Sequence, residues 1–211
     1  MNQPVSNINQ LKPKHGYVIN PPSRGAYAVE QGWWNLGEWH VVELEGGKNF
    51  PAQEGGAAFY ESTDVNSFQP PVDGLILSGG HEDVRQKLNY TDQQLLAEGK
   101  TPWPRLTVPA SKVIDIEWRY TMAHKTRGYV AFITRDGWDS DQVITRNQLE
   151  SKPFFEDIYP EAPYWEHDLP AKIHHQLVLP DHKQGHHVVV LLWLVADTGN
   201  AFYQTFDFDF G

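Results

Sequence analysis

The sequence predicts an all-β protein built as a two-sheet sandwich. Residues 113–122 alternate apolar and polar side chains with the period of two that is typical of a strand with one wet face. Residues 188–195 are apolar almost throughout, as expected for a central strand, and residues 200–210 place phenylalanines on one face. Several short strands separated by turn residues, without a regular alternation of strands and helices, favour a sandwich over an α/β fold.

The earlier part of the chain is predicted to hold one strand and a long insertion. Residues 17–19 form the first strand, which prolines 21 and 22 end because proline has no N–H to donate to a sheet. Residues 23–109 show little alternation and many glycines, prolines and aromatic residues. Since a structureless loop of that length is uncommon in a compact domain, we expect short helices within it, for example over residues 91–98. Further strands are predicted at residues 128–135 and 173–179, and a short helix near Thr145.

Composition limits the partners of the protein. The chain has 211 residues, 40% of them hydrophobic, which suits one domain with a sizeable core. Its net charge of −10 repels a phosphate backbone, so nucleic acid is excluded as a partner, whereas a neutral polymer is not. The absence of cysteine excludes disulfides, thiolate metal sites and a thiol nucleophile. No apolar run approaches the ~18 residues of a membrane span. We expect a monomer that binds neither nucleic acid nor membrane.

Residues 1–14 differ in character from the rest of the chain. They are polar, contain two prolines and lack the apolar stretch of a secretory signal peptide. We interpret them as a disordered leader or propeptide. Residues 15–211 are then the functional domain.

Ten histidines invite a metal hypothesis. Neighbours in a strand point to opposite faces, so neither the pair at 174–175 nor the pair at 186–187 chelates one ion by itself. These four are interpreted as core or capping histidines, and His40, His81, His167 and His182 as solvated loop residues. His124 directly follows the long strand, at a strand end that faces a loop-built surface. Spacing alone does not distinguish His15 or His124 from the others.

A wider pattern does distinguish them. Several short blocks, spread from His15 to the C-terminus, resemble in their order the bacterial lytic polysaccharide monooxygenases of auxiliary activity family ten, formerly called family-33 chitin-binding proteins. The blocks are His15-Gly16-Tyr17-Val18, Pro22-Ser23-Arg24, Glu45-Gly46-Gly47-Lys48-Asn49-Phe50-Pro51, Asp73-Gly74, His124-Lys125-Thr126-Arg127-Gly128-Tyr129, Thr134-Arg135-Asp136-Gly137-Trp138 and Ala196-Asp197-Thr198-Gly199-Asn200-Ala201-Phe202-Tyr203-Gln204.

The resemblance implies a fibronectin-III-like sandwich that carries one copper ion in a histidine brace on a flat face. His15 gives its backbone amine and Nδ1, and His124 gives Nε2. Imidazole and amine nitrogens suit copper, which heads the divalent affinity order. Phe202 matches the aromatic that fills the axial direction, and Glu45 matches the acid that positions oxygen or peroxide. Trp39 matches the surface aromatic that lies on the polysaccharide.

The function implied is copper-dependent oxidative cleavage of a β-1,4-linked crystalline polysaccharide, with chitin favoured over cellulose. An external electron donor and O2 or H2O2 are the co-substrates. The family also implies secretion, although no signal peptide is visible. Two alternatives remain open, a non-catalytic chitin-binding protein and a copper-binding sandwich without a polymer. An exposed Trp39 separates the last from the other two, and a free amine at His15 separates the enzyme from the binding protein.

The chain departs from the family pattern in two places. Met122 stands two residues before the second histidine, where alanine is usual, and a thioether there is expected to crowd the axial side of the copper or alter its potential. While residues 1–14 remain attached, the nitrogen of His15 is an amide, which is a poor donor unless deprotonated.

Overall fold

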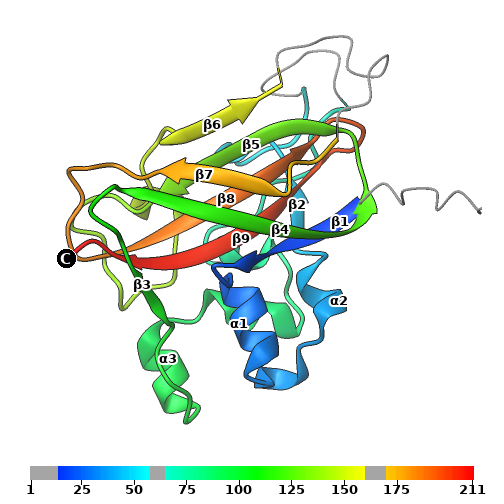
Figure 1. Cartoon of the computed structure of the whole chain (residues 1–211). Helices are drawn as coiled ribbons and strands as arrows, with labels where there is room; N and C mark the ends of the chain where they lie inside the picture. Colours follow the sequence, from blue (N-terminus) through cyan, green and yellow to red (C-terminus); the bar gives the residue numbers. More distant parts are fainter. Residues whose placement is uncertain (1–13, 58–64, 160–169) are drawn as a thin grey trace, which may run out of the picture.

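The computed structural model describes residues 14–57, 65–159 and 170–211, and in it two β-sheets pack face to face (Figure 1). The smaller sheet has the order β1 (Lys14–Asn20), β4 (Val113–Ala123), β7 (His174–Val178). The larger has the order β2 (Glu45–Gly47), β9 (Asn200–Asp209), β8 (His186–Val195), β5 (Thr126–Ile133), β6 (Phe155–Ile158), and β3 (Arg105–Thr107) pairs in parallel with β9. The predicted sandwich is confirmed.

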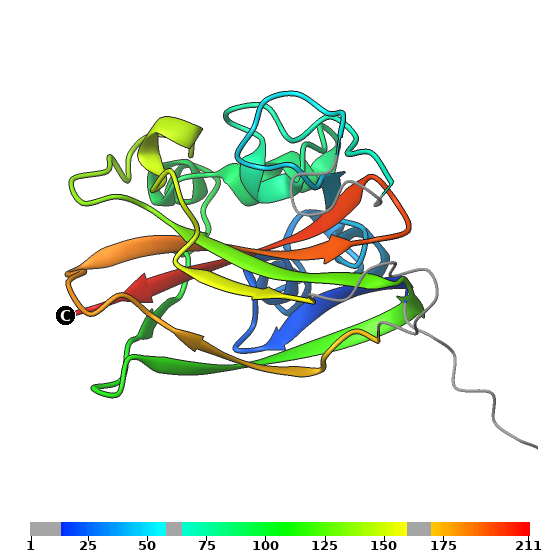
Figure 2. The same ribbon diagram turned by 90° about the horizontal axis from the view of Figure 1, so that it is seen from above.

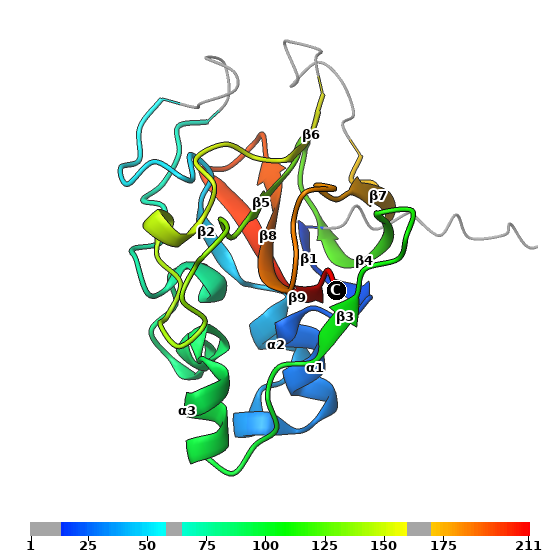
Figure 3. The same ribbon diagram turned by 90° about the vertical axis from the view of Figure 1, so that its left-hand side faces the viewer.

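The segment between β1 and β4 is the insertion expected from the sequence. Its helices gather on one side of the sandwich, as Figures 1 and 3 show. They are α1 (Arg24–Glu30), α2 (Glu38–Val41) and α3 (Asp92–Ala97), with 3-10 turns η1 (Trp33–Asn35), η2 (Ile76–Ser78) and η3 (Val84–Asn89). The Thr91 hydroxyl accepts from the Gln94 N–H and the Gln94 side chain accepts from the Thr91 N–H, so a capping box starts α3. Another 3-10 turn, η4 (Arg146–Gln148), follows Thr145.

The apolar run of β8 is explained by burial of both its faces. Odd-numbered side chains such as Leu191 and Trp193 belong to the core between the two sheets, whose layers are seen edge-on in Figure 2. Even-numbered side chains such as Val190 and Leu192 pack with Phe50 and Ile76 of the insertion in a second core. Because neighbouring side chains of a strand point to opposite faces, a strand with two buried faces has no polar alternation.

A buried ion pair joins the insertion to the larger sheet. Asp207 of β9 accepts from Arg24 Nε at 2.6 Å and from Arg24 Nη2 at 2.8 Å, and its Oδ1 lies 2.8 Å from His186 Nε2. Burial raises the pKa of Asp207, but the charge and hydrogen bonds of Arg24, with those of His186, outweigh burial and lower the pKa to about 2. Arg24 also stacks on Trp103, with Cζ 4.7 Å from the ring centroid.

Several details differ from the sequence predictions. The strands β2, β3 and β6 were not predicted, since three or four residues are too short to show a period. His40 is buried, contrary to expectation, because its Nδ1 accepts the Gly37 N–H and caps α2. His81 is half-buried, His182 is exposed, and His167 lies outside the described residues.

Within the described part of the chain, no helix is long and apolar enough to cross a membrane.

Each histidine doublet splits across its strand, as predicted. His175 and His187 are buried, whereas His174 is exposed and His186 is half-buried. Burial lowers the pKa of His175 to about 4, so this ring stays neutral, with Nε2 3.1 Å from the Lys172 carbonyl oxygen. The prediction of core histidines is confirmed for His175 and His187, and half-buried His186 bonds buried Asp207, but it is wrong for His174, which lies on the exposed face of β7.

Candidate metal centre

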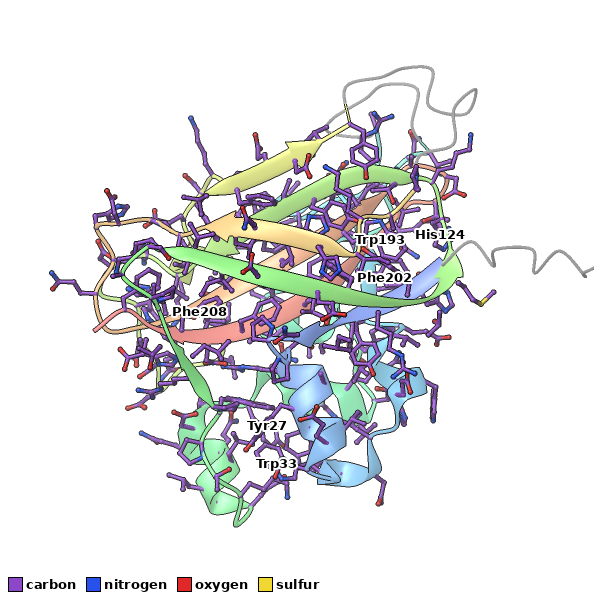
Figure 4. All side chains as sticks on the ribbon, in the orientation of Figure 1. Tyr27, Trp33, His124, Trp193, Phe202 and Phe208 are labelled. Atoms are coloured by element: carbon purple, nitrogen blue, oxygen red, sulfur yellow. The ribbon has the colours of Figure 1, made fainter. Side chains whose placement is uncertain are left out.

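Elements from four parts of the chain meet at one end of the sandwich. His15 lies near the start of β1, His124 lies in the turn between β4 and β5, and Phe202 and Glu45 face each other in the β9–β2 ladder. Figure 4 shows His124, Phe202 and Trp193 together at this end, and Phe208 at the far end of β9. Antiparallel pairing of β1 with β4 carries the first histidine to the second, because the start of β1 lies beside the end of β4.

The three rings of His15, His124 and Phe202 form a compact cluster. The imidazole centroids are 6.2 Å apart, and the Phe202 centroid lies 5.8 Å from His15 and 6.1 Å from His124. Phe202 is fully buried and stacks on Trp193 at 4.8 Å. The Trp193 indole N–H donates to the Thr126 hydroxyl, which holds the stack in place. The imidazoles therefore lie over a rigid apolar floor that offers no ligand atom.

Asp197 fixes the orientation of His124. The carboxylate Oδ1 lies 3.1 Å from His124 Nδ1, so a proton on Nδ1 is shared with Asp197 and the Nε2 lone pair stays available. Burial raises the pKa of Asp197, but the hydrogen bond and charge of His124 and nearby backbone N–H groups outweigh it and lower the pKa. Asp197 was not singled out from the sequence, although it stands in one of the quoted blocks.

Two carboxylates face His15. Glu43 Oε1 lies 3.5 Å from His15 Nδ1, and Glu45 Oε1 lies 3.4 Å from His15 Nε2. The other oxygen of Glu45 accepts from Asn200 Nδ2 at 2.6 Å, so the Glu45 carboxylate is oriented by the first residue of β9. Glu43 and Asn200 are further residues of this site that were not singled out from the sequence.

The donor set at this end suits a copper ion only in part. Two imidazoles that share one metal at bonds of about 2 Å have centroids roughly 6 Å apart, which matches the observed separation. Among the described residues, no group of three or more histidine and carboxylate side chains is arranged to hold a metal. The third nitrogen would be the backbone N of His15. Here that nitrogen belongs to the peptide bond with Lys14, the first residue of β1, which pairs with Ala123 of β4. The residues fit copper once that nitrogen is an amine.

Trp39 is a surface residue of α2, the helix whose following segment bonds to β1 next to His15. Its side chain is 63% exposed, and its ring stacks on His40 at 3.4 Å between centroids. The segment after α2 joins β1 through the Gly16 N–H, which donates to the Val42 carbonyl at 3.3 Å. With this exposure, Trp39 is not a residue of the protein core. A large exposed aromatic fixed by stacking is suited to contact with a flat partner.

Met122 lies directly opposite His15 in the β1–β4 ladder. It is 49% exposed, so half of its thioether side chain is in solvent. The fully buried side chain below the two imidazoles is Phe202. Replacing Met122 by alanine would remove little core packing.

Comparison with known proteins relates most of the chain to one family. A family model described as lytic polysaccharide mono-oxygenase, cellulose-degrading, matches residues 15–208. The chain is 33% identical over 205 residues to the AA10 family lytic polysaccharide monooxygenase C of Mycosarcoma maydis, covering 93% of this chain and 52% of that protein. It is 29% identical to the GlcNAc-binding protein A of Shewanella oneidensis, covering 96% of this chain and 37% of that protein. The chain thus spans about half or less of these two relatives.

A solved structure has the same fold over nearly all of the described part. The chitin binding domain from Burkholderia pseudomallei superposes with a TM-score of 0.83 at 38% sequence identity. The match covers 93% of this chain and 99% of that domain. The arrangement of sheets that brings the two histidines together is therefore shared with a protein of known structure.

Proposed function

Because the chain belongs to the lytic polysaccharide monooxygenase family, we propose that it is a copper-dependent enzyme that oxidatively cleaves a β-1,4-linked polysaccharide, with chitin preferred to cellulose. The observation that carries the proposal is the pair of imidazoles facing each other over buried Phe202, next to exposed Trp39. The preference for chitin is supported by the names of the two similar proteins that refer to GlcNAc and chitin binding.

In this proposal His15 and His124 hold the metal through their imidazoles, and the amine of His15 is the third donor. Bound copper, reduced by an external electron donor, supplies the oxidising chemistry with O2 or H2O2 as co-substrate. Asp197 keeps the proton of His124 on Nδ1. Phe202 keeps the floor of the site apolar and closed to water. Glu45, oriented by Asn200, positions the co-substrate through Oε1, the oxygen nearest His15.

We propose that the polysaccharide lies across the face that carries Trp39. A crystalline polymer cannot enter a deep cleft, and a flat aromatic ring stacks on the C–H face of a sugar. Because such a polymer is outside the cell, the protein acts as a secreted monomer, with residues 15–211 as the working domain and residues 1–14 removed.

The test is incubation of the chain that begins at His15, loaded with copper, with β-chitin or cellulose and a reductant. Oxidised oligosaccharides from chitin, detected by mass spectrometry, are the expected result. A His124→Ala variant is expected to release none. Binding to chitin without oxidised products from either polymer would favour the non-catalytic binding protein instead.

Replacing Asp197 by alanine is expected to weaken copper binding about 10–100-fold, because the orientation and tautomer of His124 are then no longer held. Isothermal titration with Cu(II) measures the loss. Asp197→Asn is expected to lose less, since the amide oxygen still accepts a hydrogen bond. Asp181→Ala, at an exposed carboxylate, is the matched control, and an equal loss in that variant would contradict the role given to Asp197.

Replacing Trp39 by alanine is expected to weaken binding to insoluble chitin by about 1–3 kcal/mol, the range for a lost stacked aromatic contact. The melting temperature should hardly change, because the ring is exposed. Binding isotherms and thermal unfolding of the same samples check both statements. Leu96→Ala, at a similarly exposed residue on α3, is the control. Unfolding of the Trp39 variant with unchanged binding per folded molecule would make Trp39 structural.

A further inference from the structure

Phe68 is an exposed aromatic residue outside the proposed metal centre. Its side chain is 60% exposed, close to the value of 63% for Trp39. Val72, four residues later, is 54% exposed. Exposed apolar side chains that occur together, beside a functional site, commonly mark a contact surface.

The backbone around Phe68 is firmly attached to the sandwich. The Phe68 N–H donates to the Gly199 carbonyl at 2.9 Å, and the Gly47 N–H donates to the Gln69 carbonyl at 3.0 Å. The Ser67 hydroxyl accepts from the Asn49 N–H at 3.0 Å and donates to the Phe68 carbonyl at 2.8 Å. The exposed ring is therefore carried by an ordered segment.

Two glycines allow this close approach. A Cβ at Gly199 would lie 2.7 Å from the Phe68 nitrogen and 2.9 Å from its Cγ, and a Cβ at Gly47 would lie 2.0 Å from the Phe68 carbonyl oxygen. Only glycine permits the segment to sit directly on β2 and on the turn before β9. A ring held in this way loses little conformational entropy when it binds a partner.

Phe68 borders a groove that starts at the candidate metal centre. The groove has a volume of about 300 Å³, and its lining includes Glu45, Asn200, Phe68, Pro71 and Val72. Asn200 bonds Glu45, which in turn faces His15. A chain of contacts, from His15 to Glu45 and from Glu45 to Asn200, thus leads from the imidazole pair to the groove.

Trp39 belongs to a different segment from Phe68, the helix α2 that precedes Glu43. Its helix α2 is followed by Glu43, whose carboxylate faces His15 Nδ1, whereas Glu45 and the groove face His15 Nε2. The segment that carries Trp39 is therefore linked to His15 through Glu43, and the groove that carries Phe68 is linked to it through Glu45.

We propose that Phe68 is a second substrate-contacting aromatic, which stacks on a sugar of the same polysaccharide chain that Trp39 contacts. The inference rests on the proposed function, because the occupant is the polysaccharide itself. The groove is continuous with the proposed reaction site through Glu45 and Asn200, so we expect a polymer that covers the imidazole pair to contact Phe68 as well. Apolar Val72 and Pro71 extend the contact beyond Phe68.

The test compares Phe68→Ala, Trp39→Ala and the double variant in the full chain, before and after cutting ahead of His15, using β-chitin particles. Phe68→Ala is expected to raise the dissociation constant about five- to tenfold, and Phe68→Trp to restore it. The losses of the single variants should multiply in the double variant, since the residues are not in contact. Copper affinity should be unchanged in Phe68→Ala. Leu96→Ala is again the control for an exposed apolar residue.

Wild-type chitin binding by Phe68→Ala, alongside weakened binding by Trp39→Ala, would overturn the role of Phe68 and leave the proposed function intact. No binding and no oxidised products from the unchanged chain would overturn the proposed function itself. If Phe68→Ala lowers the melting temperature, Phe68→Leu decides, because leucine keeps the apolar volume without the ring. Weaker binding by that variant with an unchanged melting temperature supports the inference, and wild-type binding overturns it.

Discussion

Cutting the chain between Lys14 and His15 is expected to raise copper affinity roughly a hundredfold or more, because a second donor on the same residue binds as an intramolecular ligand. The cut turns the amide nitrogen of His15 into an amine beside its own imidazole. The uncut chain has two imidazoles at this end, with centroids 6.2 Å apart, and among the described residues no group of three or more histidine and carboxylate side chains that could hold a metal ion. Oxidative cleavage of chitin is therefore expected from the cut form and little from the uncut form.

Copper titrations and mass spectrometry of oligosaccharides measure the two forms side by side. A chain that begins at Lys14 is the matched control, since one extra residue is enough to keep the His15 nitrogen in a peptide bond. His124→Ala in the cut form should lose most of the affinity gained. Equal copper affinity and equal activity of the cut and uncut chains would show that the amine of His15 is not a ligand.

Replacing Arg24 by alanine is expected to lower the free energy of unfolding by about 3–5 kcal/mol, because it leaves the buried carboxylate of Asp207 without its main partner. Arg24 is 7% exposed and Asp207 is 3% exposed. The pair joins α1 to β9, so its loss also loosens the insertion from the sheet. Chemical denaturation monitored by tryptophan fluorescence gives the value.

Arg105→Ala is the matched control, because Arg105 forms a 2.9 Å ion pair with Asp92 while its side chain is 43% exposed. Exposed pairs contribute about 0–1 kcal/mol, so the control should differ little from the wild type. A double change, Arg24→Met with Asp207→Leu, should recover part of the lost stability by removing both charges. A loss in Arg24→Ala no larger than in the control would contradict the account of the pair.

The same pair predicts how stability changes with pH. The pKa of Asp207 is about 2 in the folded protein, below the ordinary value of 3.8. The carboxylate therefore contributes stability above pH ~4, and that contribution is lost as the pH falls toward 2. Denaturation curves between pH 5 and 2 should show a smaller acid-dependent loss in the Arg24→Met, Asp207→Leu variant.

Much of the fold was predictable because strand patterns are local. The alternation in β4, the apolar run of β8 and the phenylalanines of β9 depend only on which face each side chain takes, and sequence neighbours determine that. The capping box at α3 is likewise a local signal, since the residues that satisfy the first N–H groups are three apart. Resemblance in short blocks added His15, His124, Phe202, Glu45 and Trp39 as candidate site residues.

Other features were decided only by the tertiary structure. Asp207 alternates with phenylalanines, and this pattern predicts a solvent-exposed polar face. In the structure the insertion covers that face, so Asp207 is buried and pairs with Arg24. Phe68 and Val72 lie in a stretch without period, so only the packing of that stretch on Gly47 and Gly199 determines that they are exposed and border the groove.

The sequence by itself determined the strands, the insertion and the family to which the chain is similar, since these depend on local patterns and on short motifs. Only the tertiary structure decided that His15 and His124 lie over Phe202, that Asp197 holds one imidazole and Glu45 faces the other, and that Trp39 is exposed. The physical reason is that sheet pairing and the packing of the insertion join residues far apart in the chain, and no local period encodes which distant residues meet.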